Sequence, residues 1–256
     1  MADLLLYEFG AQYNYQQLHT CLMGHSDFSR KTLIIHAIEQ DPESRYLFRI
    51  MTRTKSQGGL YTSDQFLFID ETHLDSITRL HGYSLIGKKA VVDLSCQERS
   101  QRSPISAICA YATQGMVSAT IMYLDVSAKF FIETLETDIL PKTSPYPGPL
   151  SIVVLDNCNV HMKHLIYELC KLYCVLVFFL PPYSYDFSPA ELSFFVAKAN
   201  MKSQHGLEPP YHRDAAEDFK KCLLNISATI ACHHFQKCDY EVTIEERTWA
   251  CAPENM

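Results

Sequence analysis

The chain has 256 residues, of which 47% are hydrophobic and 12% aromatic, and it carries a formal charge of −7. This length and composition can bury a sizeable core and argue against a disordered chain. The acidic balance counts against tight binding to nucleic acid by this chain alone, because Lys and Arg contacts to phosphate supply most non-specific affinity. The longest apolar run, Cys174 to Pro182, is far shorter than the ~20 residues that span a bilayer, so we expect no membrane segment.

The N-terminal part of the chain predicts helices. Residues from about 3 to 36 indicate several short helices, and Asp41 to Arg53 indicate one helix that starts near Pro42, a residue favoured in a first helical turn. The pair Gly58-Gly59 then marks a loop.

From residue 66 onward, strand-like and helix-like segments follow one another. We expect strands at 66–70, 105–111, 116–124, 152–156 and 175–179, and helices at 130–140, 160–173 and 189–202. Three strands followed by alternating helices and strands predict an α/β fold, a sheet that is flanked by helices on both faces.

Three acids stand at the ends of separate predicted elements. Asp70 and Asp156 each end an apolar strand, and Glu191 lies in the first turn of the last predicted helix. In α/β sheets the chemistry gathers at strand ends, so the two aspartates can lie side by side if their strands are neighbours. Three gathered carboxylates are typical of a metal-dependent phosphoryl-transfer site. Glu71, next to Asp70, should point to the opposite face of the sheet, and we leave it out of the site.

Each acid also has a purely structural interpretation. Ser188-Pro189-Ala190-Glu191 fits a capping box, in which Ser188 is the N-cap and Glu191 binds back to its backbone N–H. Asp156-Asn157 equally fits an Asx turn that leads into a helix, and Asp70 could cap a loop. On the sequence pattern alone, a capping role for Glu191 is the more common one, so the pattern leaves both interpretations of the three acids open.

The order of motifs from about Phe28 to Tyr240 resembles the mariner-like DDE transposases, also called DDE superfamily endonucleases. The motifs that carry the resemblance are Phe68–Thr72 with Gly82 and Gly87, Ser144–Gly148, Asp156-Asn157 with His161, Leu180–Ser184 continuing to Pro189 and Glu191, and then Phe194 and Lys198.

Three departures from the family pattern bear on activity. Tyr185 replaces a Pro, and Ser188 replaces an Asn, in the motif before the last acid. The helix after that acid has Asn200 and Lys202 where the family usually has Trp and then Arg. The paired DNA-binding motifs that normally precede the catalytic domain are at best half present.

The resemblance implies a ribonuclease-H-like mixed five-stranded sheet with a small N-terminal helical segment. It divides the chain into a partial helix-turn-helix and linker helix at 1–60, a catalytic domain at 61–240 and a tail at 241–256. The N-terminal helices could equally be a small cap that packs on the core and reads no DNA.

The resemblance also implies a mechanism and a set of site residues. Asp70, Asp156 and Glu191 would bind Mg²⁺, or Mn²⁺ in its place, for cleavage and strand transfer of DNA. Asn157 and His161 would support them, although His161 could simply be a partly buried residue at a helix start. The basic residues that could contact DNA are Arg30, Lys31, Lys88, Lys198 and Lys202. For the two lysines after Glu191, a solvated helix face is an alternative. We expect Phe194 and Phe195 to belong to the core.

The expected partners are the transposon ends and the target DNA, and a homodimer is possible. The ten cysteines form no Cys-x-x-Cys pair, which favours free thiols in a reducing compartment, the nucleus in a eukaryote and otherwise the cytoplasm. Cys232, His233, His234 and Cys238 match no common zinc spacing. Two hypotheses remain: an active DNA endonuclease and strand transferase, or a relic that keeps the fold and serves as a nucleic-acid-binding or interaction module.

Overall fold

A computed structural model of the chain describes residues 40–74, 105–123, 126–157, 163–204 and 215–242, together with positions 16, 17, 20 and 24. The chain separates into two compact units, Met1–Ile38 and Glu39–Met256. All helices and strands described below belong to the second unit.

A five-stranded mixed sheet forms the centre of this unit. Its strands are β1 (Phe66–Leu74), β2 (Ile105–Ala112), β3 (Gly115–Met122), β4 (Ile152–Leu155) and β5 (Leu176–Phe179). They lie in the order β3-β2-β1-β4-β5, in which β1, β2 and β3 are antiparallel and β1, β4 and β5 are parallel. The mixed five-stranded sheet that the sequence predicted is confirmed.

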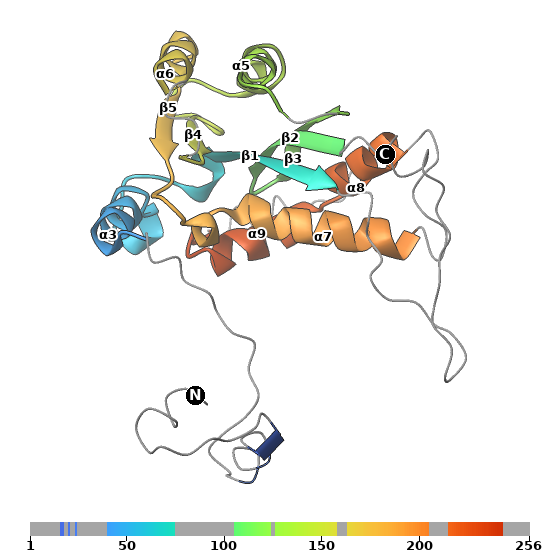
Figure 1. The fold of residues 1–256 in the computed structure, drawn as a ribbon. Helices are drawn as coiled ribbons and strands as arrows, with labels where there is room; N and C mark the ends of the chain where they lie inside the picture. Colours follow the sequence, from blue (N-terminus) through green and yellow to red (C-terminus); the bar gives the residue numbers. More distant parts are fainter. Residues whose placement is uncertain are drawn as a thin grey trace. The chain divides into compact units, whose positions relative to one another are not determined.

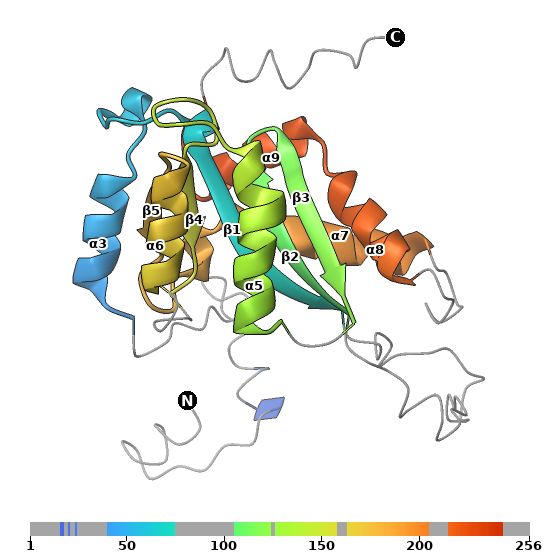
Figure 2. The ribbon, with the colours of Figure 1, turned by 90° about the horizontal axis from the view of Figure 1, so that it is seen from above.

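Helices cover both faces of the sheet (Figures 1 and 2). On one face lie α5 (Ala128–Thr134) and α6 (Lys163–Leu172), and on the other lie α7 (Pro189–Gln204), α8 (Ala215–Leu224) and α9 (Ala228–Lys237). Successive side chains of a strand point to opposite faces, so Phe66 and Phe68 pack with α7 and α9, whereas Leu67 and Ile69 pack with α5 and α6. This two-sided burial explains why the strands are continuous apolar runs.

Two predicted elements differ from the structure. Strand β1 continues to Leu74 instead of ending at Asp70, because it pairs with β2 along its whole second half. The single helix predicted at 130–140 is α5 followed by a π-helical segment, Leu135–Ile139, and a 3₁₀ turn, Leu140–Lys142. Pro141 has no backbone N–H for a bond to the residue four positions earlier, so the regular α-helix cannot continue through it.

Helix α3 (Pro42–Met51) is the helix predicted to start near Pro42. The side chain of Asp41 caps it by accepting hydrogen bonds from the N–H groups of Glu43, at 3.1 Å, and Ser44, at 3.2 Å. In the part of the chain that the structure describes, no helix combines the length and the apolar character needed to cross a membrane.

Candidate active site

The parallel pairing of β1 with β4 brings Asp70 and Asp156 together. The last paired residues of the two strands are Ile69 and Leu155. Asp70 is the next residue of β1, and Asp156 directly follows the end of β4. Both therefore project on the face of the sheet that α7 covers. The sequence predicted this arrangement on the condition that the two strands are neighbours, and they are.

Glu191 reaches the same place from α7. Ala190, Phe194, Ala197 and Met201 form the buried stripe of this helix, which packs on the sheet and directs its first turn to the ends of the strands. Asp70, Asp156 and Glu191 line one cavity of about 300 Å³. Its apolar wall comes mainly from the other face of the sheet and consists of Ile69, Phe131, Leu155, Ile166 and Phe179.

The capping-box interpretation of Glu191 does not fit the observed hydrogen bonds. In a capping box the glutamate carboxylate accepts the N–H of the N-cap residue. Here the Ser188 N–H donates to the carbonyl oxygen of Tyr185 at 2.9 Å, and the Glu191 N–H donates to the carbonyl oxygen of Ser188 at 3.3 Å. The backbone N–H of Ser188 thus already has a backbone partner and does not need the glutamate carboxylate. The Glu191 side chain lines the cavity instead.

The gathered carboxylates perturb one another. Burial, together with repulsion by Glu191 and Asp156, raises the pKa of Asp70 to about 7, although the carboxylate accepts the Glu71 N–H at 2.8 Å. Burial also raises the pKa of Glu191, with a further contribution from Asp156, whereas the nearby Lys198 ammonium lowers it. A cluster with this much unfavourable negative charge would gain from a bound cation.

Glu71 corrects one sequence-based expectation. It lies on the opposite face from Asp70, yet it also lines the cavity, because β4 ends beside Ile69 and leaves the end of the sheet open to both faces. Burial, together with the charge of Asp156, raises the pKa of the Glu71 carboxyl, while His73 lowers it. The cavity therefore contains four carboxylates.

Asn157 is held by a lysine that sequence reasoning did not single out. The Lys163 ammonium, in the first turn of α6, donates to the Asn157 side-chain oxygen and lies 4.7 Å from the centre of the Phe179 ring. The Asn157 N–H donates to Asp156 Oδ1 at 2.6 Å. Lys163 could have been noticed as the first lysine after the Asp-Asn pair.

Two of the five basic residues that were predicted to contact DNA, Lys198 and Lys202, lie among the described residues. Lys198 is half-buried, and its charge acts on Glu191 and on Cys109 of β2, so it faces the acidic site. Lys202 lies in α7. Arg30, Lys31, Lys88 and His161 lie outside the described residues.

Phe195 also corrects an expectation. Phe194 is in the core with 3% of its surface exposed, but Phe195 is 75% exposed. The two differ because neighbouring helical residues point about 100° apart, and only Phe194 falls on the stripe that faces the sheet.

Carboxylates are the ligands that Mg²⁺ and Mn²⁺ prefer, so the chemistry of the donor set fits these ions. The spacing of these side chains suits a single ion less well than their chemistry does. Among the described residues, no three Asp, Glu, His or Cys side chains are spaced to surround one ion. Metal binding at this cavity would require the carboxylates to draw closer together.

Comparison with known proteins identifies the family. The sequence model of the DDE superfamily endonucleases matches residues 65–208, which is more than half of the chain and includes all three acids. The chain belongs to the DDE superfamily endonucleases. No curated protein matches the sequence significantly.

Solved structures show which fold this DDE endonuclease has. It is similar to Mos1 transposase in its paired-end complex with the left transposon end, with a TM-score of 0.63, 14% identity, and coverage of 93% of this chain and 74% of that one. The Mos1 strand transfer complex gives a TM-score of 0.62 at 13% identity, covering 97% and 74% of the two chains. The catalytic domain of Mos1 mariner transposase gives 0.52 at 10% identity, covering 87% and 97%. The ribonuclease-H-like, mariner-type fold predicted from the sequence is confirmed.

Proposed function

We propose that this DDE endonuclease is a transposase that cuts DNA strands and joins them to target DNA at the cavity of Asp70, Asp156 and Glu191. The observation that carries the proposal is the convergence of three carboxylates from β1, from the end of β4 and from α7 on one cavity, in a chain with the family's sequence motifs and fold.

Asp70, Asp156 and Glu191 would hold Mg²⁺ or Mn²⁺. When bound to such a site, these ions neutralise charge on a phosphate and lower the pKa of water. Similar structures support this choice of ion, since Mos1 paired-end complexes were solved with Mn and with Mg. Zn²⁺ fits less well because the described residues that line the cavity include no Cys or His ligand.

The other residues at the site prepare it for a phosphodiester. The Lys163 ammonium orients Asn157, and the backbone of Asn157 in turn orients the Asp156 carboxylate. Lys198 supplies positive charge on the α7 side, where it offsets Glu191 and can contact a DNA phosphate. Burial and the neighbouring acids raise the pKa of the Asp70 carboxyl, and a bound cation would favour its ionised form.

The proposed substrates are transposon ends and target DNA, because the similar Mos1 structures are a paired-end complex and a strand transfer complex. A homodimer that pairs two DNA ends and a nuclear location in a eukaryotic cell, or otherwise a cytoplasmic one, belong to the same proposal. With a charge of −7, this chain should bind duplex DNA weakly and with a shallow salt dependence.

The test combines metal binding with strand cleavage. Calorimetry should show Mn²⁺ binding to the wild-type protein and much weaker binding to Asp156→Asn. Duplex DNA should be nicked slowly in Mn²⁺ or Mg²⁺, and Asp70→Ala should abolish the nicking. Equal Mn²⁺ binding by wild type and Asp156→Asn would contradict the assignment.

The spread of the carboxylates favours a second candidate, a relic that keeps the fold without catalysis. Fusing a complete N-terminal DNA-binding module to the chain separates the two. If the fusion binds DNA carrying the element's ends tightly but nicks no strand in Mn²⁺, the defect lies in the site, and the relic interpretation holds.

A further inference from the structure

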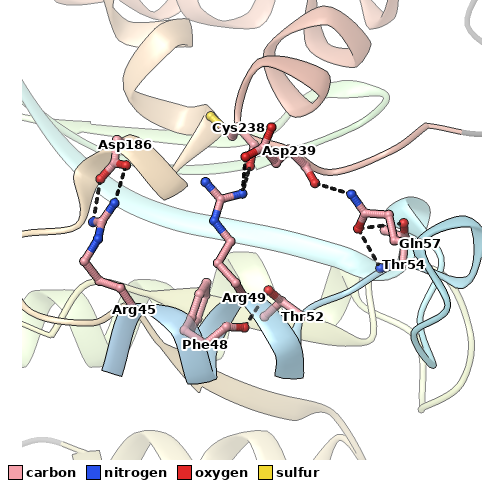
Figure 3. A network of polar contacts seen from close by, with 9 residues as sticks. All are labelled: Arg45, Phe48, Arg49, Thr52, Thr54, Gln57, Asp186, Cys238 and Asp239. Carbon is pink, nitrogen blue, oxygen red and sulfur yellow. Dashed lines mark hydrogen bonds and ion pairs between the residues drawn. The ribbon is translucent and has the colours of Figure 1, made fainter. Parts of the chain in front are cut away.

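Helix α3 makes a dense set of contacts with the segment that leads into Glu191. This segment, Leu180–Ser188, connects β5 to α7. The two terminal nitrogens of the Arg45 guanidinium donate to the two carboxylate oxygens of Asp186, at 2.9 and 2.7 Å (Figure 3). Such a two-pronged pair fixes the orientation of both partners as well as their distance.

Helix α3 also contacts Phe187, the residue that follows Asp186. Its ring is 3% exposed and stacks on Phe48, with centroids 5.7 Å apart and planes 8° from parallel. The guanidinium carbons of Arg45 and Arg49 each lie 4.1 Å from the centre of the Phe187 ring. One aromatic side chain is thus held by a ring and two cations of α3.

Three further contacts hold α3 in place. Arg49 forms an ion pair with Asp239 at 2.7 Å and donates to the carbonyl oxygen of Cys238 at 3.1 Å, at the end of α9 (Figure 3). Upstream of the helix, the Gln40 side chain donates to the carbonyl oxygen of Tyr183 at 2.6 Å. The helix is therefore anchored to the core on one side and to the connecting segment on the other.

The connecting segment couples the position of α3 to the position of Glu191. Tyr185–Phe187 form a 3₁₀ turn, closed by bonds from Phe187 N–H to Ser184 O at 3.0 Å and from Ser188 N–H to Tyr185 O at 2.9 Å. Helix α7 begins at Pro189, directly after this turn. Few rotatable bonds separate Phe187 from Glu191, and each backbone step between them is hydrogen-bonded or helical.

We propose that α3 is a clamp that sets the position of the Glu191 carboxylate, and that Arg45 and Phe48 are positioning residues for the reaction. This inference rests on the proposed role of Glu191 in metal binding. The cavity lining does not include Arg45, Phe48, Asp186 or Phe187. They act by holding the turn from which the first turn of α7 starts.

The experiment compares variants of the full chain by two readouts other than activity. Arg45→Ala removes both the charge and the two hydrogen bonds to Asp186. Arg45→Lys keeps the charge but cannot form the two-pronged pair. Asp186→Asn keeps the shape of the partner side chain and removes its charge. Arg53→Ala is the matched control, since it removes an exposed arginine just beyond the same helix. The readouts are the Mn²⁺ dissociation constant from calorimetry and amide hydrogen exchange along the chain.

We expect Arg45→Ala and Asp186→Asn to weaken Mn²⁺ binding by about 10-fold, the lower end of what the loss of an outer partner of a metal ligand costs. Arg45→Lys should recover part of this loss, and Arg53→Ala should show none. Hydrogen exchange should accelerate at residues 184–193 and stay unchanged in β1 and β2. The double variant Arg45→Ala/Asp186→Asn should bind Mn²⁺ no more weakly than either single variant, because both changes break the same contact.

Three results would overturn the clamp. Exchange that rises uniformly over the whole unit would show that Arg45 only stabilises the fold. Unchanged exchange at 184–193 would show that the turn is fixed without α3. A loss of DNA affinity with unchanged Mn²⁺ binding and exchange would make Arg45 a phosphate contact instead.

The design also separates this inference from the proposed function. If the wild-type protein binds no Mn²⁺, the metal role of Glu191 fails. The pattern of hydrogen exchange then tests by itself whether α3 acts as a clamp. Faster exchange confined to residues 184–193 supports the clamp, and any other pattern refutes it. If Arg45→Ala does not fold, the milder Arg45→Lys and Asp186→Asn carry the same comparison.

Discussion

The crowded carboxylates predict that Asp70→Asn stabilises the metal-free protein in a pH-dependent way. The Asp70 pKa is about 7 in the folded chain, against an ordinary value of 3.8. Between these values the folded state binds the proton and the unfolded state does not, so ionised Asp70 increasingly destabilises the fold as the pH rises from about 4 to 7. The effect is absent below pH 4 and complete above pH 7.

The size of the effect follows from the shift. A shift of about 3 pKa units corresponds to about 4 kcal/mol at about 1.4 kcal/mol per unit, so we expect a gain of about 2–4 kcal/mol for Asp70→Asn at pH 8 once the neighbours relax. In a protein of this size, each kcal/mol raises Tm by about 2–4 °C. The expected rise in Tm is therefore on the order of 5–15 °C at pH 8 and close to zero at pH 4.

Thermal and urea unfolding of the metal-free proteins at pH 4, 6 and 8 measure this effect. Glu136→Gln is the control, because it neutralises an exposed acid that does not line the cavity. Mn²⁺ should raise the Tm of the wild type and leave that of Asp70→Asn nearly unchanged, since binding to the folded state stabilises it by mass action. A variant that is no more stable than wild type at pH 8, or equally more stable at pH 4, would refute the reasoning.

Three further predictions follow from packing and charge. Phe194→Ala should lower the free energy of unfolding by about 3–5 kcal/mol and Phe195→Ala by less than about 1 kcal/mol, as measured by urea denaturation, because only Phe194 leaves a cavity in the core. Burial, with the charges of Lys237 and His233, lowers the pKa of His234 to about 4. The free energy of unfolding should therefore fall as the pH drops from about 6.5 to 4, because the unfolded state binds the proton first. Unfolding curves at several pH values should show a flatter slope for His234→Gln. Lys163→Met should reduce the rate of strand cleavage by about 10-fold, because it removes the hydrogen bond to Asn157. The affinity for DNA should stay unchanged in a binding titration. An equal loss of cleavage and of DNA affinity would make Lys163 a phosphate contact.

Local sequence determined most of the elements and the identity of the candidate ligands. The apolar runs at 66–69 and 152–155 predicted buried strands at these places, and the residues that follow the runs are Asp70 and Asp156. Pro42 and Asp41 mark the start of α3, and Pro189 marks the start of α7, because a proline is accommodated in the first turn of a helix and not beyond it. The order of the motifs was sufficient to recognise the family.

The sequence misjudged residues whose environment depends on a neighbouring element. Glu71 points away from Asp70, as strand alternation requires, but its access to the cavity depends on where β4 ends. Phe195 is as apolar as Phe194, and only the angle at which α7 packs on the sheet decides which of the two is buried. The sequence left Glu191 open between capping and ligation. The backbone bond of Ser188 argues against the capping box, and ligation by Glu191 stays a prediction.

The tertiary structure alone decided which distant segments meet. Sequence fixes periodicity and turn chemistry because these are interactions between residues close in the chain. The strand order that places β4 beside β1, and the pairing of Arg45 with Asp186 across 141 residues, depend instead on how the layers pack around the sheet. A charged pair at that separation leaves no local pattern in the sequence, whereas in the folded chain it fixes the turn that precedes Glu191.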